Sequence, residues 1–453
     1  MKYYRSCIFF IVFGLVWLPT ASFAADELDQ LKQTIELLKQ RLEDLEEKQN
    51  AQDTKVTELE VKDEKRVSVE KGDFPNSVKV GDISLGWGGY TKADFIWNSV
   101  ADEGASQFRN ELFLPFATPL DGTTDEENDE FQSHVKETRL WFKGTGNTPY
   151  GPWKVFFETD LFNLQNVDSE RLNNGNTPRV RHAYGQFGKI LAGQTWSTFM
   201  PVFTFPETND FGGPSGQIFV RQNQLRYTQP TSFGSASFAL ENPDASFETD
   251  AALGAGRINP SDDQYPDIVG RLDFKGDWGQ AAVGAMVRNL AIDTTVSGVT
   301  VEDDEWAGAV MAGIRLNTGG KNHIKAAVNY GATGRYNSYN TFAGAHIDAD
   351  GDIDAIETLG VNIGYTHYWS PNLYSTALIG YATADNDSDI RDVANEEVWN
   401  SVVNLLWRPT NWPKARIGIE WLHANREIEN TSGALAEDEG DLDRIQFSTK
   451  YSF

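Results

Sequence analysis

Cysteine is almost absent from this chain: the only one among 453 residues is Cys7. Cys7 lies in an N-terminal segment with Lys2 and Arg5 at its positive end, an apolar run over residues 7–18 and a small-x-small motif at residues 22–24. These are the three parts of an export signal, so we predict a signal peptide over residues 1–24 that is removed on export. Its removal excludes disulfide and thiol chemistry from the mature chain.

Long hydrophobic runs are also missing, and basic residues are fewer than acidic ones. The run over residues 7–18 is shorter than the ~20 residues that a membrane-spanning helix needs, and no longer run follows it. Lys and Arg number 39 against 66 Asp and Glu, giving a net charge of −27, which becomes −29 when Lys2 and Arg5 are lost. Such a charge argues against a nucleic-acid partner. The low mean hydropathy fits an acidic secreted protein or a transmembrane β-barrel, whose strand signal is weak in each segment.

The chain does contain segments in which apolar and polar residues alternate with a period of two. The last segment, residues 443–453, reads D-R-I-Q-F-S-T-K-Y-S-F, with aromatic and aliphatic residues on one parity and polar residues on the other. In a transmembrane barrel the apolar side faces lipid and the polar side faces a watery lumen. A terminal Phe453 after such alternation resembles the C-terminal strand of bacterial outer-membrane proteins.

Sixteen such segments separated by turn residues occur from Ile83 onward, and short turns alternate with long polar loops. They span approximately residues 83–97, 134–144, 153–163, 177–187, 189–196, 221–229, 234–242, 265–276, 278–291, 304–317, 321–334, 356–369, 372–385, 395–409, 412–426 and 441–453. An even number of strands with loops sorted by length is typical of outer-membrane barrels and not of a soluble sandwich. We therefore predict an all-β fold for residues 83–453, a 16-stranded antiparallel transmembrane β-barrel.

Heptads fill the segment before the barrel. Leu, Ile, Val and Gln occupy the a and d positions over five heptads, beginning with Leu28 and Leu31. This seam predicts an α-helical coiled coil over residues 25–61, located in the periplasm, and a linker over residues 62–82. A coiled coil requires partner chains and hence an oligomer; a lone amphipathic helix on a surface is the alternative.

Strand parity assigns side chains to the lumen. Taking the more apolar set as lipid-facing, for example Val180 and Tyr184 in segment 177–187, places a set of basic residues inside: Arg139, Arg179, Arg181, Arg226, Arg271, Arg288, Arg315, Lys325, Arg416, Arg444 and Lys450. The clear inward acids are fewer: Glu137, Glu158, Asp160, Glu241, Asp273 and Glu420. An arginine-rich lumen attracts carboxylates and phosphates, because guanidinium is always charged and offers forked donors. The alternative is that each arginine pairs with an inward acid as structural lining.

Acidic residues collect in the long loops, and one loop has a calcium-like pattern. His346 to Glu357 reads H-I-D-A-D-G-D-I-D-A-I-E, which matches the EF-hand loop except at its first position and lacks flanking helices. The predicted calcium ligands are Asp348, Asp350, the Asp352 carbonyl, Asp354 and Glu357. A merely acidic loop is the alternative, and we predict no required cofactor.

Three ordered motifs give the chain a family resemblance. G-W-G-G-Y-T-K-A-D-F (86–95), R-V-R-H-A-Y-G (179–185) and A-G-Q-T-W-S (192–197), together with the export signal and the heptads, resemble the DcaP-like outer-membrane porins. The resemblance implies a homotrimer of sixteen-stranded barrels in the outer membrane of a Gram-negative bacterium, with periplasmic helices. It also implies passive uptake of small anions, dicarboxylates above all. The basic residues that fall within a matching motif are Arg179 and Arg181.

Porins commonly fold the loop after the fifth strand inward, which by analogy is Thr198 to Val220 here. Glu207 and Asp210 would then face the arginines and create a transverse field at a constriction. The leading hypothesis is therefore an anion-preferring diffusion porin. A structural anchor, tethered to the periplasm by its coiled coil, is the second hypothesis. An enzyme is disfavoured because the six histidines are scattered and no nucleophile or acid–base constellation stands out.

Overall fold

The computed structural model describes residues 25–62, 69–100, 111–122, 129–162, 177–260, 262–433 and 435–453. The predicted export signal, residues 1–24, lies outside these ranges. The chain divides into two compact units, one ending at Ser68 and one running from Val69 to Phe453.

The described part of the first unit is one α-helix, α1 (Ala25–Lys62), of 38 residues. Its sequence is rich in Leu, Glu, Lys and Gln and contains no Gly or Pro, which favours a continuous helix. The seam residues Ile35, Leu38, Leu42 and Leu45 are 47 to 63% exposed in the single chain. Within the described ranges, no helix combines the length and apolarity that crossing a membrane would require. The helix is as predicted, and its pairing into a coiled coil stays a prediction.

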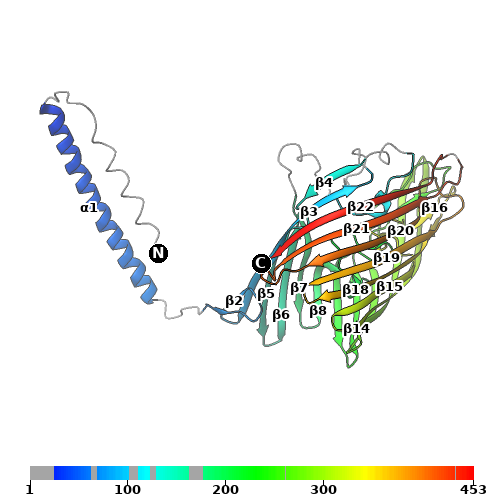
Figure 1. Ribbon diagram of the computed structural model, residues 1–453, viewed down its shortest axis with the longest axis horizontal. Helices are drawn as coiled ribbons and strands as arrows, with labels where there is room; N and C mark the ends of the chain where they lie inside the picture. The colour runs from blue at the N-terminus through cyan, green and yellow to red at the C-terminus, as the bar shows by residue number, and fades with distance from the viewer. Residues whose placement is uncertain are drawn as a thin grey trace. The chain divides into compact units, whose positions relative to one another are not determined.

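The second unit is a closed antiparallel barrel of sixteen strands (Figure 1). In order around the ring they are β3 (Ile83–Asn98), β5 (Arg139–Thr148), β6 (Gly151–Asp160), β7 (Arg179–Phe187), β8 (Ile190–Trp196), β9 (Arg221–Pro230), β10 (Gly234–Glu241), β12 (Asp267–Gly276), β13 (Gly279–Val296), β14 (Val299–Gly319), β15 (Asn322–Gly331), β18 (Glu357–Ser370), β19 (Leu373–Asp385), β20 (Asn395–Trp407), β21 (Ala415–Ile428) and β22 (Glu439–Ser452). The last strand closes the ring on the first, with register running from Arg444↔Asn98 to Ser452↔Tyr90. Each predicted segment coincides with one of these strands, so the predicted barrel is confirmed.

Three further strands extend the wall beside β3. β1 (Val69–Lys71) and β2 (Ser77–Val80) form a hairpin. β2 pairs with the first residues of β3, on the edge that β22 pairs with further along the strand. β4 (Glu130–His134) pairs with the far end of β3, from Asp94 to Asn98. Part of the predicted linker over residues 62–82 is therefore sheet, because the edges of β3 that β22 and β5 leave open accept these short strands.

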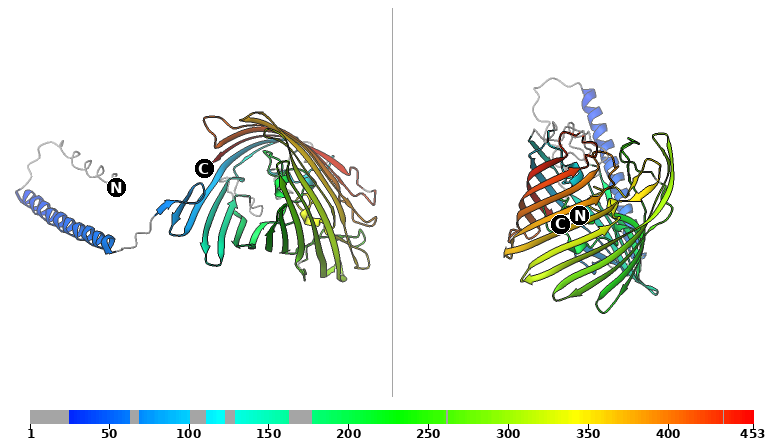
Figure 2. Two further views of the ribbon diagram at one scale, coloured as in Figure 1. Left: turned by 90° about the horizontal axis from the view of Figure 1, so that it is seen from below. Right: turned by 90° about the vertical axis from the view of Figure 1, so that its right-hand side faces the viewer.

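Burial alternates along the strands in the sense expected of a membrane barrel. In β3 the side chains of Trp87 and Trp97 are exposed on the outside, whereas those of Lys92 and Asp94 are buried inside. β22 repeats the pattern, with Ile445 outside and Arg444 inside. A soluble sheet would bury the aromatic side. Figure 2 shows the ring from two further sides, with loop segments lying inside it.

One parity assignment is wrong: Tyr184 faces inward. The pairing of β6 with β7 shifts register between Glu158 and Thr159, opposite His182 and Val180. This β-bulge inserts one extra residue into β7. The inward-facing residues are therefore odd-numbered up to Arg181 and even-numbered at Tyr184. Lys154 on the inner face of β6 donates a hydrogen bond to the Tyr184 hydroxyl at 2.7 Å. Val180 lies outside, as predicted.

The long loops fold into a cap with its own core. β11 (Phe247–Thr249), β16 (Ala345–Ile347) and β17 (Ile353–Ala355) form a small sheet, in which β11 and β16 are parallel. Its apolar face packs on the extended ends of β13 and β14, through residues such as Phe247, Leu290 and Val301. Three short 3₁₀ helices complete the described loops: η1 (Pro115–Ala117), η2 (Val202–Thr204) and η3 (Gly334–Tyr336).

Candidate functional site

The segment between β8 and β9, residues 197–220, lies inside the barrel and is called the inner loop here. Lys325 of β15 donates a hydrogen bond to the Phe205 carbonyl at 2.6 Å. Glu420 of β21 accepts hydrogen bonds from the backbone N–H groups of Asn209 and Asp210, both at 2.7 Å. Strands from different parts of the ring thus hold the inner loop, which crosses the lumen and narrows it.

Glycines on the inner wall allow this loop to lie directly against the strands. A Cβ at Gly380 of β19 would overlap the carbonyl oxygen of Ser215, and one at Gly360 of β18 would meet the carbonyl oxygen of Gly216. The same half of the wall is also covered by Phe113, which packs on inward apolar residues of β19, β20 and β21. The open part of the lumen therefore lies beside the other half of the wall.

The two acidic residues predicted for the constriction differ in surroundings. The Asp210 carboxylate accepts hydrogen bonds from Arg444 Nη1 and from the Gly212 N–H, both at 2.6 Å, and from the Phe113 N–H at 3.2 Å. Its residue is only 3% exposed, so it mainly ties the inner loop to the wall and to Phe113. Glu207 lies 3.3 Å from Arg408 and is partly exposed. A transverse field from these carboxylates stays a prediction.

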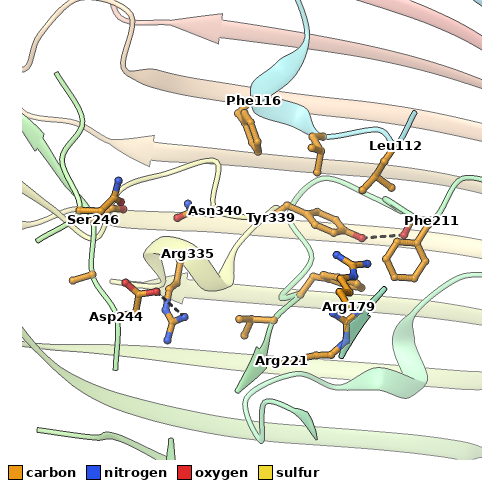
Figure 3. Close-up of a pocket in the computed structure, with 15 residues that line it drawn as sticks. Leu112, Phe116, Arg179, Phe211, Arg221, Asp244, Ser246, Arg335, Tyr339 and Asn340 are labelled. Atoms are coloured by element: carbon orange, nitrogen blue, oxygen red, sulfur yellow. Dashed lines mark hydrogen bonds and ion pairs between the residues drawn. The ribbon is translucent and has the colours of Figure 1, made fainter. Parts of the chain in front are cut away.

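Among the described residues, two cavities lie in the open part of the lumen. The upper cavity, toward the long loops, has a volume of about 380 Å³, and its charged lining residues are Arg179, Arg221, Asp244 and Arg335 (Figure 3). The lower cavity, toward the short turns, has a volume of about 330 Å³, and its charged lining residues are Glu137, Arg139, Arg181, Glu207, Asp210, Arg416 and Lys450. Phe211 and Phe219 line both cavities. The region beside these two rings, where the two cavities adjoin, is called the passage here.

A cluster of arginines surrounds the passage between the cavities. Arg179 binds Asp160 through two hydrogen bonds of 2.8 and 3.1 Å. Arg181 binds Glu158 at 2.8 Å and Asp160 at 2.9 Å, and Arg139 lies 3.6 Å from Glu158. The structure thus brings together three predicted site residues, and two carboxylates are shared among their three guanidinium groups.

Arg221 adds a fourth guanidinium to this cluster. Its cation lies over the ring of Trp196 at 4.3 Å and over that of Phe219 at 5.6 Å. Its buried Nε and Nη2 atoms have no hydrogen-bond partner within the part of the chain that the structure describes. Burying such donors without partners costs free energy.

The remaining predicted arginines do not join the cluster. Arg271 donates to the carbonyl oxygens of Thr198 and Met200, both at 2.9 Å, and so holds the start of the inner loop. Two others are buried in ion pairs, Arg288 with Asp267 at 3.3 Å and Arg444 with Asp210 at 2.6 Å. Further along the inner wall are Arg226 on β9 and Arg315, which donates to Asn317 at 3.1 Å. Arg271, Arg288 and Arg444 are thus held by contacts within the chain, and the choice between solute binding and structural lining stays open for the arginines as a set.

The sequence analysis did not identify two basic residues that line the upper cavity. Arg221 is the first residue of β9, directly after the inner loop, where parity gives no clear assignment. Arg335 lies in a loop and contacts Asp244 at 3.3 Å. A basic residue at the first position of the strand that follows a constriction loop is the signal that could have identified Arg221.

The calcium-like loop is the hairpin that joins β16 to β17. Asp348 accepts hydrogen bonds from the backbone N–H groups of residues 350, 351 and 352 at 2.8 to 2.9 Å, so its carboxylate caps the turn. His346 is buried in the small sheet and Glu357 begins β18. In the described ranges, no three His, Cys, Asp or Glu side chains converge as they would around a metal ion. Calcium binding by Asp348, Asp350, Asp352, Asp354 and Glu357 stays a prediction.

Comparison with known proteins agrees with this architecture. Residues 165–453 match the family described as DcaP outer membrane protein. The crystal structure of the outer membrane channel DcaP of Acinetobacter baumannii is similar, with a TM-score of 0.67 and 19% identity over 82% of this chain and 97% of that chain. An anion-selective porin from Comamonas acidovorans shares the fold more distantly, with a TM-score of 0.51 and 11% identity over 82% of this chain and 100% of that chain. No curated sequence matched the chain. The family match covers more than half of the chain, which therefore belongs to the DcaP outer membrane protein family and has the fold of an outer membrane channel.

Proposed function

We propose that the barrel is a diffusion channel for small hydrophilic solutes that prefers anions, with dicarboxylates as the favoured class. The observation that carries this proposal is the excess of guanidinium groups at the passage. In the described ranges, the carboxylates in ion-pair contact with Arg139, Arg179, Arg181 or Arg221 are those of Glu158 and Asp160. Low-dielectric walls strengthen the field of such an excess along a narrow lumen.

The division of the cluster between two cavities supports the preference for dicarboxylates. Arg179 and Arg221 open on the upper cavity, whereas Arg139 and Arg181 open on the lower one. A solute with a carboxylate at each end would meet a guanidinium on both sides of the passage. Forked donors bind each carboxylate with two hydrogen bonds, which a single chloride ion cannot use in the same way. The similarity to a porin described as anion-selective is consistent with this preference.

The test uses the full mature chain in planar lipid bilayers. In a salt gradient, the sign of the reversal potential should show that anions are more permeant than cations. Succinate added to the chloride solution should interrupt the chloride current more often than acetate does at the same concentration of carboxylate groups. Cation preference that persists over a wide range of salt concentration would overturn the anion preference. Equal effects of succinate and acetate would overturn the preference for dicarboxylates.

A structural role for the helix is the second candidate. The seam residues of α1 are strongly exposed in one chain, and burying them between parallel helices would stabilise a homotrimer with a periplasmic coiled coil. A variant that lacks residues 25–68 but keeps β1 tests this role. Loss of the trimer in native electrophoresis with unchanged conductance per barrel would assign assembly or tethering to the helix. Loss of conductance would show that the helix also serves the channel.

A further inference from the structure

Three aromatic residues from two loops pack against one another where the two cavities adjoin. Phe211 and Phe219 of the inner loop stand at 85° to each other with ring centroids 5.5 Å apart. Tyr339, from the loop that follows β15, stacks on Phe219 with centroids 4.2 Å apart. Its hydroxyl donates a hydrogen bond to the Phe211 carbonyl at 3.0 Å, as Figure 3 shows. Tyr339 therefore contacts both residues that line the two cavities.

The backbone that presents Tyr339 has an unfavourable conformation. Ser338, Tyr339 and Asn340 have φ angles of 48°, 61° and 68°, all in the left-handed region. Bulky side chains are rare in this region, because Cβ comes too close to the following carbonyl oxygen. Strain of this kind persists only where surrounding contacts determine the conformation, and it concentrates at functional sites.

Hydrogen bonds hold this turn from both sides. Toward the inner loop, Ser338 donates its N–H to the Gln217 carbonyl at 3.0 Å and accepts from the Gly216 N–H at 2.7 Å through Oγ. Toward the cap, Arg257 donates to the carbonyl oxygen of Asn340 at 3.1 Å and to its side-chain oxygen at 2.8 Å. Contacts on both sides fix the strained turn, and together they position the Tyr339 ring.

We propose that Tyr339 determines the size limit of the channel by acting as a strut between Phe211 and Phe219. The space left for a solute is then set by two loops together: the inner loop supplies the two rings, and the loop after β15 holds them in position. This inference rests on the proposed channel function. A merely structural Tyr339 would affect folding or stability but would leave the size of the largest admitted solute unchanged.

The decisive variant is Tyr339→Ala, measured as single-channel conductance with poly(ethylene glycol) of graded size in the bath. Removing the ring should raise conductance roughly twofold and admit larger polymers, because flow depends on the cross-section of the narrowest segment. Tyr339→Phe keeps the stack and loses the hydrogen bond to Phe211, so the same conductance with greater current noise is expected. Tyr150→Ala is the matched control, since Tyr150 is 88% exposed at a short turn, and it should behave as wild type.

The outcomes separate this inference from the proposed function. A wild-type protein that inserts and does not conduct refutes the channel function itself. Wild-type conduction with a Tyr339→Ala variant of unchanged conductance and polymer size limit refutes the strut. If Tyr339→Ala does not fold, Tyr339→Cys in the cysteine-free mature chain replaces it. A charged methanethiosulfonate reagent should then reduce its conductance, and a conductance unaffected by the reagent would overturn the inference.

Discussion

Replacing Arg221 by glutamine tests the proposed selectivity most directly. The substitution removes one of four guanidinium groups at the passage and leaves the carboxylates of Glu158 and Asp160 in place. The excess of positive charge at this point falls from two to one. Glutamine keeps a polar side chain beside Trp196 and Phe219, so the aromatic frame of the passage is expected to remain.

The size of the effect follows from the position of Arg221. A solute carboxylate in contact with the guanidinium lies at about 4 Å, where the attraction is about 1 kcal/mol in bulk water and about 4 kcal/mol at an effective dielectric constant of about 20. We take the lower of these two values as a conservative basis for the prediction. A loss of about 1 kcal/mol corresponds to roughly a fivefold fall in the ratio of anion to cation permeability.

The assay is the reversal potential across a planar bilayer with a tenfold gradient of potassium chloride. Arg315→Gln is the matched control, because Arg315 carries the same charge on the inner wall, donates a hydrogen bond to Asn317 and is not among the lining residues of either cavity. It should change the ratio much less. Arg221→Lys should retain most of the preference. Equal shifts for Arg221→Gln and Arg315→Gln would show that net charge alone sets selectivity, and the reasoning would then be refuted.

Three further substitutions test the loops around the passage. Burial and two neighbouring aspartates raise the pKa of Asp263 to about 6, so its carboxylate loses charge as pH falls. Anion preference should therefore rise from about pH 7 to about pH 5 in reversal-potential measurements, and Asp263→Asn should remove this step. Arg444→Glu leaves Asp210 buried without its cation, a change that costs about 3–5 kcal/mol; the inner loop should detach and conductance should become larger and noisier. Gly380→Val forces a side chain against the Ser215 carbonyl and should displace the same loop without changing any charge. Conductance traces identical to wild type in both loop variants would contradict the described attachment.

The barrel could be predicted from the sequence because its signal is local and repeated. Each strand has a membrane-facing side that must be apolar, so alternation recurs in every strand and errors in one segment do not spread to the next. The pattern in the last strand, with Ile445 outside and Arg444 inside, was sufficient to assign both faces. Turn lengths then fixed the antiparallel order. The short strands β1 and β2 were missed because their pairing depends on the unoccupied edge of β3, which no local pattern records.

Parity fails where the backbone departs from regular pairing. The bulge in β7 moved Tyr184 to the inner face, and a one-residue insertion of this kind leaves no distinct trace in R-V-R-H-A-Y-G. Arg221 begins its strand and was therefore not assigned to either face. The sequence could show that arginines line the inner wall, but it could not show which of them meet, since that depends on the path of the inner loop.

That path is what divides the inward arginines into two groups. Where small residues such as Gly360 and Gly380 form the inner wall, the inner loop can lie on the strands, and its backbone fills that half of the lumen. Arginines that reach the inner loop, such as Arg271 and Arg444, become its hydrogen-bond donors. On the opposite half the inner loop meets the wall through aromatic rings such as Phe211, which lies under Arg181, and arginines there also line the cavities. Glycine on one half and arginine on the other therefore specify together where solutes can pass, and the selectivity of the passage depends on both.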